Sequence, residues 1–137
     1  MNISSRCEYA CRAMVELALH EQSQETINSV LIAERRHIPE KYLVHILLQL
    51  KHAGMVRSIR GAQGGYQLCR PADETTLLDI VQAIDGPILD PLPVQDTGSN
   101  DLRGAWQEVA KGIEDVLRQT TVRTLAEKAA TNNLYYI

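Results

Sequence analysis

Phenylalanine is absent from this chain of 137 residues and tryptophan occurs once, so the core has to be built from aliphatic side chains and alanine. Such a composition favours helices packed on helices. No apolar run is long enough to cross a bilayer, and the first residues lack the apolar stretch of a signal peptide. We therefore expect a cytoplasmic protein that makes no contact with a membrane.

Cysteine is also scarce, with three residues in the whole chain. An odd number of thiols in a reducing compartment argues against a disulfide framework. Cys7 and Cys11 lie four residues apart, so a helix would place them on one face at a spacing that hardly permits a disulfide. Packed thiols are the simplest interpretation, a redox pair or two metal ligands are the alternatives, and Cys69 is expected to pack locally.

The motifs of common catalytic sites are missing as well. The chain has no glycine-rich nucleotide loop before a helix, no nucleophile elbow, and no paired carboxylates with an accompanying histidine. Its four histidines lack the paired spacing of zinc ligands. We therefore expect no enzymatic activity, no metal site and no cofactor.

Positive charge is confined to the first half of the chain. The formal net charge of −3 excludes a uniformly basic nucleic-acid coat. Residues 1–72 carry nine basic and six acidic side chains, whereas residues 73–137 carry five and eleven. The excess is concentrated in residues 33–71, where seven Lys and Arg stand against two Glu. A polyanionic partner would have to bind this part of the chain.

Hydrophobic periodicity predicts three helices in the first half. The first covers roughly residues 5–20, the second is short and follows a cap at Asn28 or Ser29, and the third runs from about 40 to 53 and ends at Gly54. The residues of the third helix that are expected to face inward are Leu43, Ile46, Leu47 and Leu50.

The pattern then changes to that of strands. Segments 55–60 and 66–69 flank a glycine-rich tip, which predicts a β-hairpin. Two helices, a short turn, a third helix and a hairpin are the order of a winged helix-turn-helix, in which the helix after the turn enters the DNA major groove. The expected fold class is therefore mainly α with a small β-hairpin wing, followed by a long carboxy-terminal helix.

The outward face of the third helix suits DNA. Val44 and Leu48 are unusual on a solvated face but suit thymine methyl groups, although an exposed face that tolerates two apolar residues is the alternative. Arg60 precedes the glycines and is placed to enter a minor groove. The residues expected to bind DNA are Arg35, Lys41, His45, Lys51, His52, Arg57, Arg60, Gly61, Gly64 and Gly65.

The pattern in the second half of the sequence predicts that two chains associate. We expect a winged helix-turn-helix domain over residues 1–86, a linker over 87–100, and a dimerisation helix with a tail over 101–137. The long helix carries a heptad seam formed by Leu102, Trp106, Val109, Ile113 and Val116. The seam predicts a homodimer, although an amphipathic helix packed on its own domain shows the same pattern.

Several runs resemble one known family. IAER at 32–35, IPEKYL at 38–43, LKHAGMV at 50–56 and SIRGAQGGY at 58–66 are similar to the Rrf-two family of winged-helix regulators. With Trp106, the resemblance covers nearly the whole chain. It implies a dimeric bacterial transcription regulator that binds double-stranded DNA at a palindromic operator and exchanges its long helix across the two-fold axis.

Two branches of this family differ in their cysteines. Its iron–sulphur sensors carry three closely spaced cysteines before the long helix, whereas residues 88–100 hold none, so we expect no cluster. The branch of cysteine-metabolism repressors is similar in residues 85–88, in Thr120-Thr121 and in the ending Tyr135-Tyr136-Ile137. This resemblance implies a repressor of cysteine and sulphur metabolism genes with cysteine synthase as corepressor.

The carboxy-terminal tail is the candidate docking segment. After a short helix over 122–130, Asn132-Asn133 predicts a turn that lifts Tyr135, Tyr136 and Ile137 from the body. An isoleucine carboxylate suits a backbone N–H nest in the synthase, while a tail packed on its own dimer is the alternative. Two other interpretations stay open: a regulator that responds to thiol oxidation or a small ligand, and an interaction protein that modulates cysteine synthase without DNA.

Overall fold

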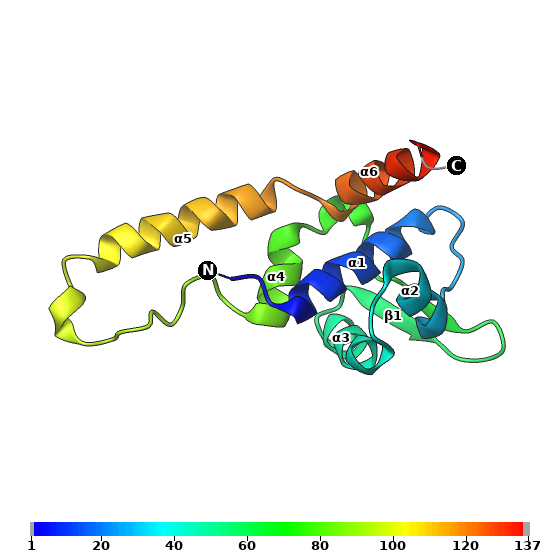
Figure 1. Cartoon of the computed structure of the whole chain (residues 1–137), viewed down its shortest axis with the longest axis horizontal. Helices are drawn as coiled ribbons and strands as arrows, with labels where there is room; N and C mark the ends of the chain where they lie inside the picture. The colour runs from blue at the N-terminus through cyan, green and yellow to red at the C-terminus, as the bar shows by residue number, and fades with distance from the viewer. Residues whose placement is uncertain (1, 136–137) are drawn as a thin grey trace.

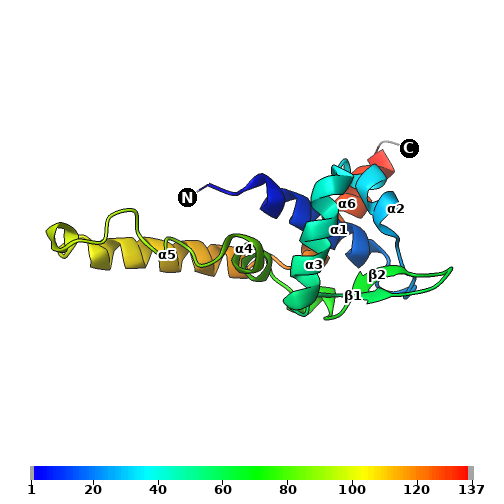
Figure 2. The same cartoon turned by 90° about the horizontal axis from the view of Figure 1, so that it is seen from below.

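The computed structural model describes residues 2–135, with the exception of the side chains of Ser99 and residues 133–135. Within this range the chain forms six α-helices and a two-stranded antiparallel sheet. Figures 1 and 2 show a body that contains α1 to α4, the hairpin and α6, and an arm formed by α5 and the segment that precedes it. The expected fold class, mainly α with a β-hairpin wing and a long helix, is confirmed.

Helix α1, Ser5–Leu19, is the centre of the body. The Ser4 hydroxyl caps it by accepting a hydrogen bond from the backbone N–H of Cys7 at 3.0 Å. Its apolar stripe is buried, and α2, α3, α4 and α6 all pack around it. The first helix was therefore predicted to within a residue at each end.

Helices α2, Ser29–Arg36, and α3, Glu40–His52, form the helix-turn-helix. The Asn28 side chain caps α2, and His37 ends it in the left-handed region at φ 53°. Pro39 then starts α3. All four residues predicted to face inward from α3, Leu43, Ile46, Leu47 and Leu50, have no exposed surface.

The wing is the hairpin of β1, Val56–Ile59, and β2, Gly65–Leu68, in a register that pairs Val56 with Leu68. The segment before α2 joins it: the backbone of Ile27 donates to and accepts from Tyr66, at 3.0 and 2.9 Å. The Thr26 hydroxyl also donates to the carbonyl of Gln63 at 2.6 Å. The wing is thus fastened to the helix-turn-helix by main-chain bonds.

The chain leaves the body for the arm and then returns to it. Helix α4, Leu77–Asp85, begins with a capping box formed by Thr76 and Asp79, and α5, Arg103–Arg118, follows the linker. On the return, the backbone N–H of Val122 donates to the Thr75 carbonyl at 2.8 Å. Within residues 2–135, no helix is both long enough and apolar enough to cross a membrane.

Helix α6, Val122–Tyr135, belongs to the body. Val122 and Ala126 are buried, and the helix packs on α1. The predicted turn at Asn132-Asn133 was wrong, because α6 continues through both residues.

Candidate nucleic-acid interface

The outward face of α3 is exposed as expected. Val44 and Leu48 are exposed by 61% and 50%, which is unusual for large apolar side chains in a helix whose opposite face is fully buried. The polar residues that share this face and are exposed are Lys41, His45, Lys51 and His52. The face therefore combines donors with two apolar side chains that point away from the core.

Lys51 connects this face to the wing. Its ammonium Nζ donates to the hydroxyl of Ser58 on β1 at 3.0 Å. Because side chains alternate along a strand, Ser58 shares the α3 side of the hairpin with Val56, whereas Arg57 points to the opposite side. Arg60, exposed just beyond the end of β1, lies at the wing tip.

Two of the expected DNA-binding residues lie elsewhere. The Arg57 Nε donates to the Gln67 side chain at 3.0 Å on the hairpin face away from α3. Arg35 directs Nη1 to the carboxylate of Glu16 at 3.3 Å. The structure therefore brings together the α3 residues and the wing but leaves these two arginines outside that surface.

Glu16 is a buried carboxylate that the sequence analysis missed. It is only 5% exposed, and it accepts from His20 at 3.1 Å and from Arg35, with Arg36 at 3.9 Å. A charge at this depth requires such partners. The cluster ties α1 to α2, and a glutamate within the apolar stripe of the first helix was its sequence signal.

The wing glycines have different roles. A Cβ on Gly65 would lie 2.7 Å from the carbonyl of Ile27, and one on Gly64 would collide with the carbonyl oxygen of Ile59. These two glycines serve the close approach of the chain to itself. Gly61, at φ 110°, is needed for the turn alone, because a Cβ there would have no atom within 4 Å.

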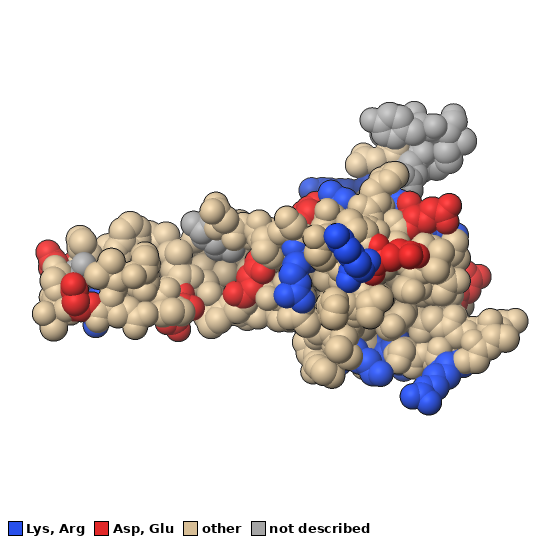
Figure 3. Space-filling view, turned by 60° about the horizontal axis from the view of Figure 1, so that its bottom comes forward, with Lys and Arg blue, Asp and Glu red and all other residues tan. Residues whose placement is uncertain are grey.

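Basic side chains gather on the body. Most of the Lys and Arg side chains visible in Figure 3 lie there, while acidic side chains are spread over the arm as well. This distribution agrees with the excess of positive charge in residues 33–71. A polyanion would thus meet the body rather than the arm.

The five residues of the apolar seam of α5 differ in burial. Leu102, Trp106, Val109 and Val116 are 45–64% exposed. Ile113 instead packs with Leu117 against a buried cluster formed with α1 and α4. Four of the five seam residues are therefore exposed, whereas Ile113 packs within its own chain, as in the alternative that the pattern left open.

Cys7 and Cys11 belong to the same buried cluster. Interaction with Cys11 lowers the pKa of Cys7, and the same interaction together with burial raises the pKa of Cys11. Cys7 is fully buried and Cys11 half-buried, whereas Cys69 is exposed at the end of β2, so its expected local packing was wrong.

Tyr136 and Ile137 of the docking tail lie outside the described residues, and Tyr135 ends α6.

A helix-turn-helix with an exposed second helix and a wing fastened beside it defines a transcriptional regulator of the winged-helix class. The sequence comparisons give the family. A model described as "Rrf2: Iron-dependent Transcriptional regulator" matches residues 3–128. The chain belongs to the Rrf2 family, whose homologues carry the names of regulators and not of enzymes.

Relatives and solved structures agree with this assignment. An HTH-type transcriptional regulator of Mycobacterium tuberculosis is 36% identical over 92% of this chain and 81% of its own. The HTH-type transcriptional regulator CymR of Bacillus subtilis is 35% identical over 92% and 90%. The structure of CymR, titled the global cysteine regulator of B. subtilis, superposes with a TM-score of 0.81 at 31% identity over 93% and 98%. The T. potens IscR structure gives 0.76 at 31% over 94% and 88%.

The family description mentions iron, but the donors in this chain do not fit an iron–sulphur cluster. Residues 88–100 hold no cysteine. The thiols of Cys7 and Cys11 lie in an apolar cluster, Cys69 lies on the wing, and residues 2–135 contain no group of three or more His, Cys, Asp or Glu placed to hold a metal ion. Thiolate ligands for a cluster are therefore missing where they would be needed.

Proposed function

We propose that this protein is a repressor that binds a palindromic operator in double-stranded DNA as a homodimer. The observation that carries the proposal is the outward face of α3, with donors around Val44 and Leu48 and with Lys51 bonded to the wing. The proposed reading residues are Lys41, His45, Lys51, His52 and, at the wing, Arg60.

Each part of this surface has its own task. Helix α3 lies in the major groove, where Lys41 and His45 reach base edges or phosphates and the apolar pair meets thymine methyl groups. Arg60 enters the adjacent minor groove, whose negative potential is strongest where A·T pairs narrow it. Lys51 keeps the helix and the wing in a fixed relation, so both grooves are read together.

The second copy is proposed to bind the exposed face of α5. Four large apolar side chains on one helix face, Leu102, Trp106, Val109 and Val116, form a surface that water solvates poorly. A two-fold axis through this face gives an isologous interface and presents two α3 helices to two half-sites. The dimer thereby matches the symmetry of a palindrome.

Fluorescence anisotropy with promoter duplexes tests DNA binding. We expect Lys41→Ala and Arg60→Ala to weaken binding and to flatten the slope of log K against log salt by about 0.9 for each phosphate that is no longer neutralised. Lys111→Ala, on the exposed arm, is the matched control that removes one positive charge from α5 instead of α3. Unchanged affinity of both α3 and wing variants would refute the surface.

We propose cysteine and sulphur metabolism genes as the targets, supported by the similarity to CymR over nearly the full length of both chains. The test is to map the DNA bound by the protein in its own cell. Enrichment upstream of genes for cysteine synthesis or sulphur uptake is the expected result. Binding confined to unrelated promoters would remove this role and leave the regulator class intact.

Cysteine synthase is the proposed corepressor, docked through Tyr135, Tyr136 and Ile137. The support is the resemblance of this ending to that branch of the family and the chemistry of an isoleucine carboxylate in a backbone nest. Calorimetry of the synthase with the parent, with a variant lacking Ile137 and with a variant carrying one added Gly is decisive. Both changes should abolish binding, and equal heats for all three would exclude docking.

A further inference from the structure

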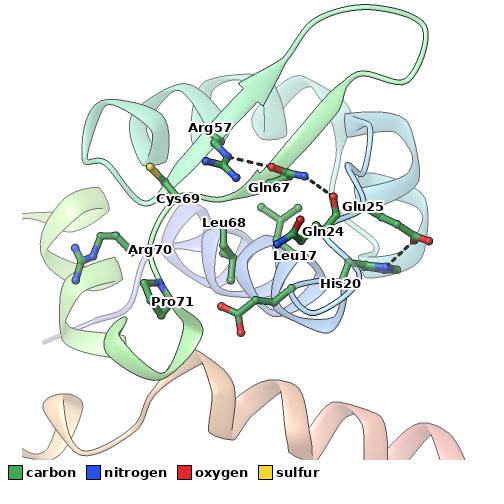
Figure 4. Close-up of a pocket in the computed structure, with 11 residues that line it drawn as sticks. Leu17, His20, Gln24, Glu25, Arg57, Gln67, Leu68, Cys69, Arg70 and Pro71 are labelled. Atoms are coloured by element: carbon green, nitrogen blue, oxygen red, sulfur yellow. Dashed lines mark hydrogen bonds and ion pairs between the residues drawn. The ribbon is translucent and has the colours of Figure 1, made fainter.

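A pocket lies between the end of α1 and the base of the wing (Figure 4). Its volume is about 230 Å³, below the range of roughly 300–1,000 Å³ typical of sites for drug-sized ligands. Leu17 and Leu68 supply apolar surface in its middle. The polar groups that line it come from His20, Glu21, Gln24, Glu25, Arg57, Gln67, Cys69 and Arg70. A ligand of amino-acid size fits these dimensions.

Arg57 is the anion-binding group of the pocket. Its Nε donates to Gln67, and among the described residues no carboxylate lies within ion-pair distance of its guanidinium. The four N–H groups on its two Nη atoms remain to donate, and they suit a carboxylate in bidentate geometry. Arg70, by contrast, is already paired with Asp79 at 3.4 Å. The pocket therefore offers one available positive charge.

Glu25 is the corresponding cation-binding group. Its Oε2 lies 3.6 Å from Nδ1 of His20, and the side chain of Glu25 is 67% exposed. Glu21 cannot take this role, because its two oxygens accept from the Ala72 backbone at 2.7 Å and from Arg123 at 3.1 Å. In Figure 4, Arg57 lies on the hairpin side of the pocket and Glu25 on the side of the loop after α1, with Gln67 and Gln24 between them.

We propose that this pocket binds a free α-amino acid as an effector, with its carboxylate on Arg57 and its ammonium group on Glu25. One available charge of each sign in a small pocket matches a zwitterion better than a phosphate, which Glu25 would repel. The side chain of the ligand would lie over Leu17 and Leu68, which limits it to a short one.

The position of the pocket connects this ligand to the wing. The Gln67 side chain accepts from Arg57 and donates to the carbonyl of Gln24, so it bridges β2 and the loop after α1. A carboxylate bound at the Nη groups of Arg57 draws the guanidinium toward the ligand and away from Gln67, which weakens that bridge. The wing, with Arg60 at its tip, then changes its position relative to α3, and the affinity for DNA changes with it.

Calorimetry with the purified full-length protein tests binding directly. The probes are the twenty L-amino acids at millimolar concentration, each compared with its decarboxylated amine and its deaminated acid. We expect one or more short amino acids to bind, the two analogues to bind at least about tenfold more weakly, and Arg57→Gln and Glu25→Gln each to weaken binding about tenfold or more. Arg103→Gln on the arm is the control that keeps the parent affinity.

Three outcomes would overturn the proposal: no amino acid binds, the simple acid binds as tightly as the amino acid, or Arg57→Gln keeps the parent affinity. The effect on the wing rests on the proposed function and is measured separately, by DNA anisotropy with and without the bound amino acid. Glu25→Gln, which leaves the Arg57–Gln67–Gln24 bridge intact, should bind DNA like the parent and lose the response. If an amino acid binds in calorimetry but the protein binds no DNA, the proposed repressor function is refuted and the pocket assignment stands. If the protein binds DNA and no bound amino acid alters its affinity, the coupling between pocket and wing is refuted.

Discussion

The α-carbon of Gly65 lies so close to Ile27 that a Cβ at this position would be 2.7 Å from the Ile27 carbonyl. Residues 38 positions apart in the sequence thus meet with no room for a side chain, at the bridge where the segment before α2 joins the wing. The position of the wing depends on this contact.

Gly65→Ala should therefore lower the free energy of unfolding by about 2 kcal/mol, because the chain must shift at the Ile27 bridge and because φ is 152°. Gly61→Ala is the control: its φ is also positive, but its surroundings are empty, so only backbone strain is added. Urea denaturation measures both variants. Equal losses of stability would show that the close approach to Ile27 contributes nothing.

Val44 and Leu48 should contact the methyl groups of thymine bases in the major groove. Replacing thymine by deoxyuridine at a contacted position of a bound promoter fragment removes about 0.8 kcal/mol of apolar contact, or about fourfold in Kd. In a Val44→Ala, Leu48→Ala double variant the same replacement should have little effect. The salt dependence should be unchanged in every case, since the same phosphates stay neutralised. An equal response of parent and variant to deoxyuridine would contradict the assignment.

Glu16→Gln should destabilise the body by about 2 kcal/mol, because Arg35 and Arg36 lose the buried carboxylate that they share. Glu8→Gln removes an exposed carboxylate that pairs with Arg12 at 3.4 Å, and a loss of at most about 1 kcal/mol is expected there. Thermal or urea unfolding compares the two. A smaller effect at position 16 than at position 8 would show that the buried cluster is not structural.

The double variant Val109→Asp, Val116→Asp should be a folded monomer. Both side chains are exposed in the single chain, so the charges are penalised only when a second copy covers them. Sedimentation velocity gives the mass and circular dichroism the fold, with Glu108→Gln on the same helix as control. A dimer that survives at micromolar concentration would remove this face from the interface.

The three thiols should differ in alkylation. Cys69 is exposed and should react first with iodoacetamide, whereas the raised pKa of Cys11 keeps its thiol protonated until the medium is strongly alkaline. The rate at Cys11 should thus keep rising with pH beyond the range in which an ordinary thiol has levelled off. Mass spectrometry of peptides follows each site, and fast labelling of Cys11 at neutral pH would contradict the raised pKa.

Periodicity was sufficient where a residue's environment depends on its own helix. The inward stripe of α3 and the cap at the start of α2 were predicted from a few neighbouring residues, because spacing and local hydrogen bonds determine both. The same local rule placed Val44 and Leu48 on the outward face. The order of elements, read together, gave the winged helix-turn-helix.

Contacts between distant segments were not predictable in this way. The wing glycines were interpreted as room for DNA, whereas Gly65 makes room for Ile27, and nothing near either residue indicated the pairing. The heptad pattern of α5 could not show that Ile113 faces α4.

The return of α6 to the body also has a consequence for synthesis. Val122 and Ala126 complete the core around α1, although the ribosome makes them after the wing, the linker and α5. Until α6 is synthesised, the side of α1 that it covers stays exposed in the nascent helix-turn-helix, and the apolar face of α5 is exposed at the same time. During that interval the chain offers the surfaces that holding chaperones recognise, and release of its last helix is the step that lets the core close.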